Sequence, residues 1–256
     1  MRNLFSAIFL LIACQSYAFD WQDGPELSKL FSTSGVKGTF VLYDVSANRF
    51  IGHERFRAET RFIPASTFKI PNSLIGLSTG VVKSVDEVMP YGGKPQPVKA
   101  WEHDMGLREA IKISNVPIYK ELARRIGLDA MRENFAKIGY GNGEIGTAVD
   151  DFWLIGPLKI SAVEQAQFLA RLAKDELPFP KDIQAKVREI VQLEQGNGWI
   201  LYGKTGWDSK IGWWVGWVQK ENRIYSFALN IDMPDTTNAA KRIELGKACL
   251  KTLGVL

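Results

Sequence analysis

Residues 64–71 read PASTFKIP, and this segment predicts both a helix and the chemistry expected of the chain. Pro64 stands where prolines begin helices, so we expect a helix over about residues 65–77. Residues three apart on a helix share a face, which places the amine of Lys69 one turn from the hydroxyl of Ser66. A serine becomes a nucleophile when an adjacent base takes its proton, and a buried lysine can be that base. Taken alone, this spacing is also typical of a serine that caps a helix.

Two further motifs follow along the chain, Ser114-Asn115-Val116 and Lys204-Thr205-Gly206. Alone, the first is typical of a polar connection between helices, because Pro117 marks the start of the next helix. The second follows an aromatic, β-branched run that predicts a strand, and its glycine would let a substrate backbone approach closely. Neighbouring strand residues point to opposite faces, so both side chains can line a site only where the strand bends. In this order, the three motifs are typical of enzymes that acylate a serine with a β-lactam or a D-Ala-D-Ala peptide.

The composition is that of an ordinary globular protein, with 46% hydrophobic and 23% charged residues in a chain of 256. One folding unit, or one split by an insertion, is therefore expected. The net charge of +4 is modest, and the sequence has no run of Lys and Arg and no zinc-knuckle spacing. These features predict no nucleic-acid partner. Beyond the N-terminus no apolar segment reaches about 18 residues, so no stable membrane partner is expected.

The N-terminus has the features of a secretory signal peptide. A basic start precedes the mostly apolar residues 4–13, and residues 16–18 present small side chains where signal peptidase cleaves. We therefore expect residues 1–18 to be a signal peptide, residues 19–256 to be a single domain, and the product to reach the periplasm. An alternative interpretation is a lipoprotein, because the sequence just before Cys14 resembles the box in which that cysteine is acylated.

Cysteine and histidine counts exclude several chemistries. The sequence has two cysteines, and cleavage after residue 18 would leave Cys249 alone and without a disulfide. Cys249 falls in a predicted C-terminal helix, where a buried apolar role is the default. The two histidines, His53 and His103, lie in no recognisable nucleophile or metal motif. We therefore expect no metal site, and surface or capping roles for both histidines.

Strand signals lie at both ends of the chain, and helical signals lie between them. Alternating, β-branched segments predict strands at residues 38–45, 49–53, 199–204, 212–219 and 223–231. Periodic segments predict helices at residues 107–113, 117–126, 129–138, 165–173, 182–193 and 239–253, the fourth preceded by a capping box at Ser161 and Glu164. The expected fold is α/β, of the α+β type: an antiparallel sheet from both chain ends flanked by helices, with an all-helical insertion at about residues 80–195. The active site would lie where the two regions meet.

Further motifs carry a resemblance to a known family over essentially all of residues 19–256. They are Tyr140-Gly141-Asn142, Phe152-Trp153-Leu154, Trp207 directly after the lysine motif, and the run GWWVGW at residues 212–217. With the segment at residues 64–71, this combination resembles the class D serine β-lactamases, the oxacillin-hydrolysing group. The resemblance implies the penicillin-binding-protein and serine-β-lactamase fold. It also implies hydrolysis of the β-lactam ring of penicillins and related antibiotics.

The resemblance implies roles for the residues around the nucleophile. Ser66 matches the serine that β-lactams acylate. Lys69 matches the family lysine that reacts with carbon dioxide to give N6-carboxylysine, the general base. No cofactor is therefore expected, apart from the carbon dioxide or bicarbonate needed for this carboxylation. The indole N–H of Trp153 matches the hydrogen-bond donor to that carbamate. Apolar surroundings would be supplied by Phe68, Val116 and Leu154.

The resemblance also implies roles in the rest of the cleft. Ser114 would relay a proton to the leaving nitrogen, with Lys204 close by. The oxyanion hole would consist of the backbone N–H groups of Ser66 and Trp207. Arg242, helped by Thr205, would bind the substrate carboxylate. Substrate contacts are implied for Val116, Leu154, Thr205, Gly206, Arg242 and, at the entrance, Trp101.

Two rival functions share these motifs. A penicillin-binding D,D-peptidase would act on cell-wall peptides, but the surroundings of Trp153 and Val116 match the lactamases. A β-lactam sensor domain would be acylated and not turned over, and such sensors are tethered to a membrane signalling unit. The sequence leaves open the oligomeric state, the response to inhibitors and the range of substrates, carbapenems included.

Overall fold

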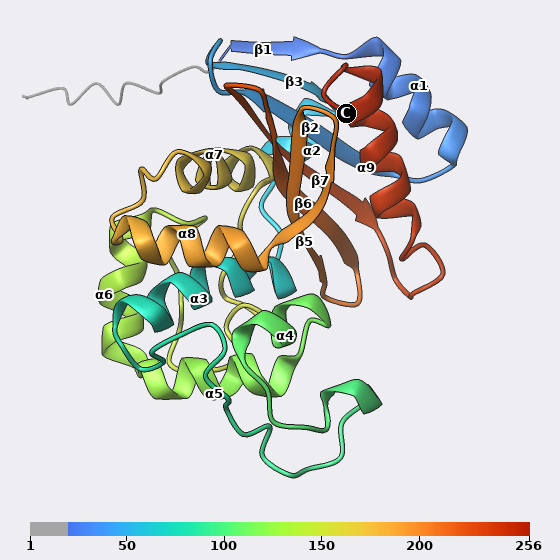
Figure 1. Cartoon of the computed structure of the whole chain (residues 1–256). Helices are drawn as coiled ribbons and strands as arrows, with labels where there is room; N and C mark the ends of the chain where they lie inside the picture. The colour runs from blue at the N-terminus through green and yellow to red at the C-terminus, as the bar shows by residue number, and fades with distance from the viewer. Residues whose placement is uncertain (1–19) are drawn as a thin grey trace, which may run out of the picture.

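A computed structural model gives the architecture of residues 20–256 (Figure 1). The predicted signal peptide and Cys14 lie outside the described residues. Across the described range, no helix combines the length and the apolar character that crossing a membrane requires.

One seven-stranded sheet is built by residues 20–256, in the order β1-β3-β2-β7-β6-β5-β4. Its strands are β1 (Asp20–Asp23), β2 (Gly38–Asp44), β3 (Arg49–His53), β4 (Gln192–Gly196), β5 (Trp199–Trp207), β6 (Ile211–Lys220) and β7 (Arg223–Asp232). Neighbouring strands are antiparallel except β1 and β3, which pair in parallel. β2 pairs with β7, with Val41 opposite Ala228, so the two ends of the chain form one sheet as predicted.

Helices cover both faces of this sheet and fill a region beside it (Figure 1). They are α1 (Pro25–Ser34), α2 (Arg55–Glu59), α3 (Lys69–Ser78), α4 (Leu107–Lys112), α5 (Val116–Ile126), α6 (Leu128–Ile138), α7 (Ala162–Ala173), α8 (Lys181–Ile190) and α9 (Lys241–Thr252). On one face, α1 packs against α9, and α9 packs against β2, β6 and β7. On the other face α7 packs against the same three strands, while α3 meets α5 and α8 in the helical region. The predicted fold class is confirmed.

Alternation along β6 divides the hydrophobic core in two. Trp213, Val215 and Trp217 belong to the cluster shared with α7 and the helical region. Trp214 and Val218 belong to the cluster beneath α1 and α9. Successive strand residues point to opposite faces, so a continuous apolar run can be buried on both sides. Each large side chain buried in this way contributes roughly 1.5–3 kcal/mol relative to an exposed position. The tryptophan run therefore also stabilises the sheet.

The sequence-based prediction differs from the structure in one helix end and in four elements that it did not include, β1, α1, α2 and β4. The helix predicted over residues 182–193 is α8, which ends at Ile190, and the edge strand β4 follows almost at once. β4 has the sequence QLEQG and is exposed along its whole length, so it lacks the alternation that marks a half-buried strand. At the other end, β1, α1 and α2 were not predicted. β1 and α2 are short, and α1 buries only Leu27 and Phe31, so its periodic signal is weak.

Candidate active site

Ser66 lies in a 3-10 turn, η1 (Ala65–Phe68), which leads directly into α3. The predicted helix is therefore present, but its first turn is wound more tightly than an α-helix. Ala65 begins the turn with a φ of 49°, a left-handed conformation that is strained for a residue with a side chain. Its backbone N–H donates to the carbonyl of Trp153 at 2.9 Å. A distant segment of the chain thus fixes the turn that carries the serine.

Lys69 is fully buried, and its Nζ lies 3.1 Å from Oγ of Ser66. This distance confirms the predicted contact between residues three apart. Burial lowers the pKa of Lys69 well below its usual 10.5, and the positive charge of Lys204 lowers it further. The ring of Tyr119 lies 4.9 Å from the same Nζ. A neutral amine at this distance from a hydroxyl can accept its proton, which is the task of a general base.

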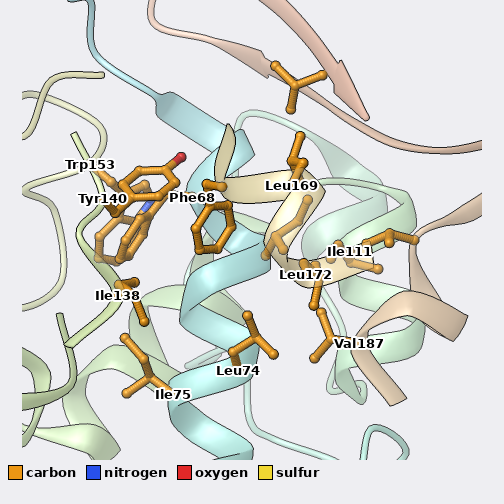
Figure 2. Close-up of a cluster of buried hydrophobic side chains, with 14 of the residues drawn as sticks. Phe68, Leu74, Ile75, Ile111, Ile138, Tyr140, Trp153, Leu169, Leu172 and Val187 are labelled. Atoms are coloured by element: carbon orange, nitrogen blue, oxygen red, sulfur yellow. The ribbon is translucent and has the colours of Figure 1, made fainter. Parts of the chain in front are cut away.

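Trp153 is the second buried group against the nucleophile turn. Its ring stacks on Phe68 with centroids 5.4 Å apart, and both rings are fully buried beside α3 (Figure 2). The indole Nε1 is buried and has no hydrogen-bond partner among residues 20–256. Buried N–H groups are almost always paired. This donor therefore points to an acceptor that the described polypeptide does not supply.

A buried chain of polar side chains supports the turn from behind. Oγ1 of Thr67 donates to the carbonyl of Pro64 at 2.8 Å and accepts from Nε2 of Gln165 on α7, also at 2.8 Å. The hydroxyl of Tyr140 donates to Oε1 of Gln165 at 3.2 Å. Gln165 was not predicted as a site residue from the sequence. Its one signal was a polar residue among the apolar positions of an amphipathic helix.

The second motif forms the connection between α4 and α5, as its polar composition predicted. Ser114 is half-buried and has a left-handed φ of 56°. Asn115 is fully buried and caps α5 by accepting from the backbone N–H of Ile118 at 3.0 Å. Oγ of Ser114 accepts a hydrogen bond from Nζ of Lys204, so the structure brings the second and third motifs together.

Lys204 lies on β5, buried, with its amine among oxygen atoms. Besides Ser114, its Nζ contacts the carbonyl of Thr205 at 3.1 Å and Oγ1 of Thr205 at 3.4 Å. The two side chains leave opposite faces of the strand, but the long lysine chain curls back, so their polar ends meet. Burial, with the charge of Arg242 as a smaller cause, lowers the pKa of Lys204 to about 7.

β5 runs so close to the nucleophile turn that Gly206 has no room for a side chain. A Cβ at this position would lie 2.7 Å from the carbonyl oxygen of Pro64. The carbonyl of Gly206 accepts from Nη1 of Arg242 at 2.7 Å, and Nε of Arg242 donates to the carbonyl of Ala239 at 3.0 Å. The guanidinium is thus held at the end of β5, where its other N–H groups could bind a carboxylate beside Thr205.

The other predicted residues have mixed exposure. Trp207 exposes 37% of its surface, and its indole donates to the carbonyl of Met233 at 2.7 Å. Half-buried positions are held by Val116, Leu154 and Trp101. A cavity of about 220 Å³ opens beside Lys204 and Thr205. A hollow of about 680 Å³ between α1 and α2 is larger but contains none of the predicted site residues, so its size does not make it the active site.

The histidines and the described cysteine lie outside the three motifs. His53 contacts Oγ of Ser28 at 2.9 Å and stacks on Phe31, which ties β3 to α1. His103 pairs with Glu109 at 2.9 Å on the surface. Cys249 is buried, and burial raises the pKa of its thiol to about 12. Within residues 20–256, no group of three His, Cys, Asp or Glu side chains is placed to hold a metal ion.

The chain matches one protein family and several known proteins over most of its length. The family described as penicillin binding protein transpeptidase domain matches residues 38–251. The chain is 36% identical to β-lactamase OXA-10 of Pseudomonas aeruginosa over 98% of both chains. The crystal structure of FUS-1 (OXA-85), a class D β-lactamase from Fusobacterium nucleatum subsp. polymorphum, matches with a TM-score of 0.89 and 44% identity, over 92% of this chain and 100% of that one. This chain belongs to the class D β-lactamases.

A second pair of relatives extends the match. The chain is 37% identical to β-lactamase OXA-48 of Klebsiella pneumoniae over 96% of both chains. It also matches the crystal structure of the class D β-lactamase YbXI from Nostoc, with a TM-score of 0.87 and 40% identity, over 90% of this chain and 99% of that one. In this class D β-lactamase, the cleft is assembled from three regions that are far apart in the sequence. They are η1 with the start of α3, the connection before α5, and β5.

Proposed function

We propose that this class D β-lactamase hydrolyses the β-lactam ring of penicillins and related antibiotics through an ester on Ser66. The observation that carries the proposal is the pair formed by Ser66 and the fully buried Lys69, with 3.1 Å between hydroxyl and amine. Similarity to β-lactamases over nearly the whole chain supports the same activity.

In acylation, Ser66 gives its proton to the base at Lys69 while Oγ forms a bond to the lactam carbonyl carbon. The carbonyl oxygen becomes an oxyanion, which the backbone N–H groups of Ser66 and Trp207 would hold. When this centre collapses, the C–N bond of the ring breaks and its electron pair stays on nitrogen. Ser114 would protonate that nitrogen and regain a proton from Lys204, whose Nζ already donates to Oγ of Ser114.

We propose that the amine of Lys69 is carboxylated by carbon dioxide. Two features of the described residues fit that group: burial favours the neutral amine that reacts, and the buried indole N–H of Trp153 has no other partner. When bound, the carboxyl group supplies an anionic general base. Trp153 would donate its N–H to the anion, and the stacked ring of Phe68 would help to exclude water.

Hydrolysis of the ester needs a water molecule activated at the same place. Before this step the proton taken from Ser66 leaves the base at Lys69, and Lys204 regains the proton it gave to Ser114, so both groups return to their starting states. The base would then take a proton from the water while the water oxygen attacks the ester carbonyl. The C–O bond to Ser66 then breaks, and the proton returns to Oγ. Because one base serves both halves of the reaction, changes at Lys69 should affect release of the product as well as acylation.

Arg242 and Thr205 are proposed to hold the carboxylate of the substrate. The supporting observation is the bond from Arg242 to the carbonyl of Gly206, which sets the guanidinium at the end of β5. Arginine binds a carboxylate with two parallel N–H groups, so this placement would orient the lactam along the strand.

Export to the periplasm is also a proposal. It is supported by the apolar residues 4–13 and by the small side chains of Ser16 and Ala18. N-terminal sequencing of the mature protein should begin at Phe19. A start at a lipid-modified Cys14 would contradict the proposal and place the enzyme on a membrane surface.

Intact mass spectrometry tests the proposed reaction. Mixed with a slowly hydrolysed penicillin, the parent should gain one adduct that is absent in Ser66→Ala, and a chromogenic cephalosporin should be turned over many times. An adduct that persists in Ser66→Ala would refute the assignment of the nucleophile. An adduct that forms on the parent and is never released would favour a sensor domain or a D,D-peptidase.

A further inference from the structure

Two hydrogen bonds tie Trp101 to the residues on either side of Ser114. The indole Nε1 of Trp101 donates to the carbonyl of Ile113 at 3.0 Å. The side-chain Nδ2 of Asn115 donates to the carbonyl of Trp101 at 3.3 Å. Trp101 ends the short turn η2 (Lys99–Trp101). The loop between α3 and α4 is therefore fastened by the side chain of Trp101 to Ile113 and by its backbone carbonyl to Asn115.

Ser114 needs support of this kind because its backbone is strained. Its φ of 56° is left-handed, and a serine keeps such a conformation only where its neighbours hold it. The residue after it, Asn115, is fully buried and fixed as the cap of α5, so the carbonyl of Ile113 is the freer of the two flanking groups. A small rotation there would move the hydroxyl of Ser114 away from Nζ of Lys204.

We propose that Trp101 is a positioning residue for Ser114. It holds the backbone carbonyl of Ile113 on one side and the side chain of Asn115 on the other, so that the hydroxyl stays between Lys204 and the leaving nitrogen. The inference rests on the proposed function, because the proton relay is a step of that reaction. It differs from the role that the resemblance implied, in which Trp101 flanks the entrance and contacts the substrate. A positioning role affects every β-lactam, whereas an entrance contact depends on the substrate's side chain.

Trp101→Phe tests the proposal because it removes the indole N–H and keeps an aromatic ring at the entrance. Trp21→Phe is the matched control: Trp21 is also half-buried, and its indole donates to Asp23 at 2.8 Å on the distant strand β1. Both variants are assayed with benzylpenicillin and with 6-aminopenicillanic acid, which lacks the acyl side chain.

We expect Trp101→Phe to lower kcat about five- to tenfold for both substrates, the size of effect that losing one hydrogen bond produces, with KM little changed. Trp21→Phe should stay within about twofold of the parent. A loss confined to benzylpenicillin, or a change in KM alone, would show an entrance contact and overturn the proposal.

A double-mutant cycle with Ser114→Ala gives a second readout. If Trp101 acts through Ser114, adding Trp101→Phe to Ser114→Ala should change the acylation rate by less than about twofold. Effects of the two substitutions that multiply would overturn the proposal.

If Trp101→Phe melts well below the parent, Trp101→Tyr, which also lacks the indole N–H, takes its place in the cycle. A parent protein that forms the Ser66 ester but never releases it would refute the proposed function without refuting the role of Trp101. Acylation rates, measured by intact mass, would still give all four values of the double-mutant cycle.

Discussion

The two buried lysines of the site, Lys69 and Lys204, lie in opposite kinds of surroundings. Nζ of Lys69 contacts the hydroxyl of Ser66 and the face of an aromatic ring. Nζ of Lys204 contacts three oxygen atoms, one from Ser114 and two from Thr205. Burial is the largest cause of the lowered pKa in both lysines.

This difference shows how one residue type can serve two purposes in one cleft. An amine with few polar neighbours is best held neutral, so it can take a proton or react with carbon dioxide. An amine surrounded by acceptors keeps its proton more easily and can donate it. The positive charges of the site also influence one another. The charge of Arg242 lowers the pKa of Lys204, and the charge of Lys204 lowers the pKa of Lys69. The positive end of the cleft thus helps to keep the base neutral.

Lys69→Ala should separate the two lysines most clearly. Loss of the general base is expected to slow acylation about 10²–10⁴-fold and to slow release of the product as well. Stopped-flow kinetics with a chromogenic cephalosporin, combined with intact mass, measures both steps. Lys204→Ala should slow acylation but leave release near the parent rate. A larger loss in Lys204→Ala than in Lys69→Ala would reverse the assignment of the two roles.

Trp153→Phe should slow release of the product about 10–100-fold. An anion that loses a buried hydrogen bond is destabilised by about 1–3 kcal/mol, which would favour free Lys69 and make activity depend on added bicarbonate. Trp213→Phe is the matched control, since that tryptophan is equally buried and its indole already donates to the carbonyl of Ile63 at 2.8 Å. Parent-like turnover of penicillin by Trp153→Phe, unaffected by bicarbonate, would mean that the indole holds no anion.

The titration of Lys204 should also appear in the pH profile of kcat/KM, which reports the ionisations of the free enzyme. Its pKa of about 7 predicts that the rate falls as pH rises above 7, because the donor to Ser114 loses its proton. The fall should approach tenfold for each further pH unit. In Lys204→Met this limb should disappear, with a lower rate throughout. A limb that stays in place in Lys204→Met would assign the titration to another group.

Lys204→Met should also raise the free energy of unfolding at pH 6, because the lowered pKa means that the folded protein destabilises the charged form of Lys204. The folded pKa of Lys204 is about 7 and its unfolded value is 10.5, so between these values the unfolded chain binds the extra proton and the parent gains stability as pH rises. The advantage of Lys204→Met should therefore be full below pH 7 and shrink towards pH 10. In thermal melts, the Tm of Lys204→Met should exceed that of the parent by about 2–4 °C for each kcal/mol of added stability. An advantage that grows with pH would contradict the lowered pKa.

Much of the fold followed from the sequence because its signals are local. The strands that became β2, β3, β5, β6 and β7 have buried, β-branched or aromatic residues, and the capping box of α7 is present as predicted. β4 was missed for the opposite reason. It is exposed and polar, and it is a strand only because it pairs with β5, a contact that no local pattern encodes.

The contacts of the site also fall into local ones, which the sequence predicts, and long-range ones, which it does not. Ser66 and Lys69 are three residues apart, so their contact could be predicted from helical spacing alone. Gln165 meets Thr67 through a long-range hydrogen bond that depends on how α7 crosses the sheet. The hydrogen bonds that join Trp101 to Ile113 and Asn115 likewise depend on the path of the loop between α3 and α4. Such contacts are set by tertiary packing, and one sequence does not display them.

The distinction between the two lysines is tested most directly by ¹³C NMR of the protein equilibrated with labelled bicarbonate. We expect one carbamate resonance in the parent and none in Lys69→Ala. In Lys204→Ala the resonance should persist, weakened only by the loss of the Lys204 charge that lowers the pKa of Lys69. Acidification should remove the resonance, since protonation of the free amine competes with carboxylation. Absence of any carbamate resonance in the parent, or one that persists in Lys69→Ala and vanishes in Lys204→Ala, would contradict this account of the site.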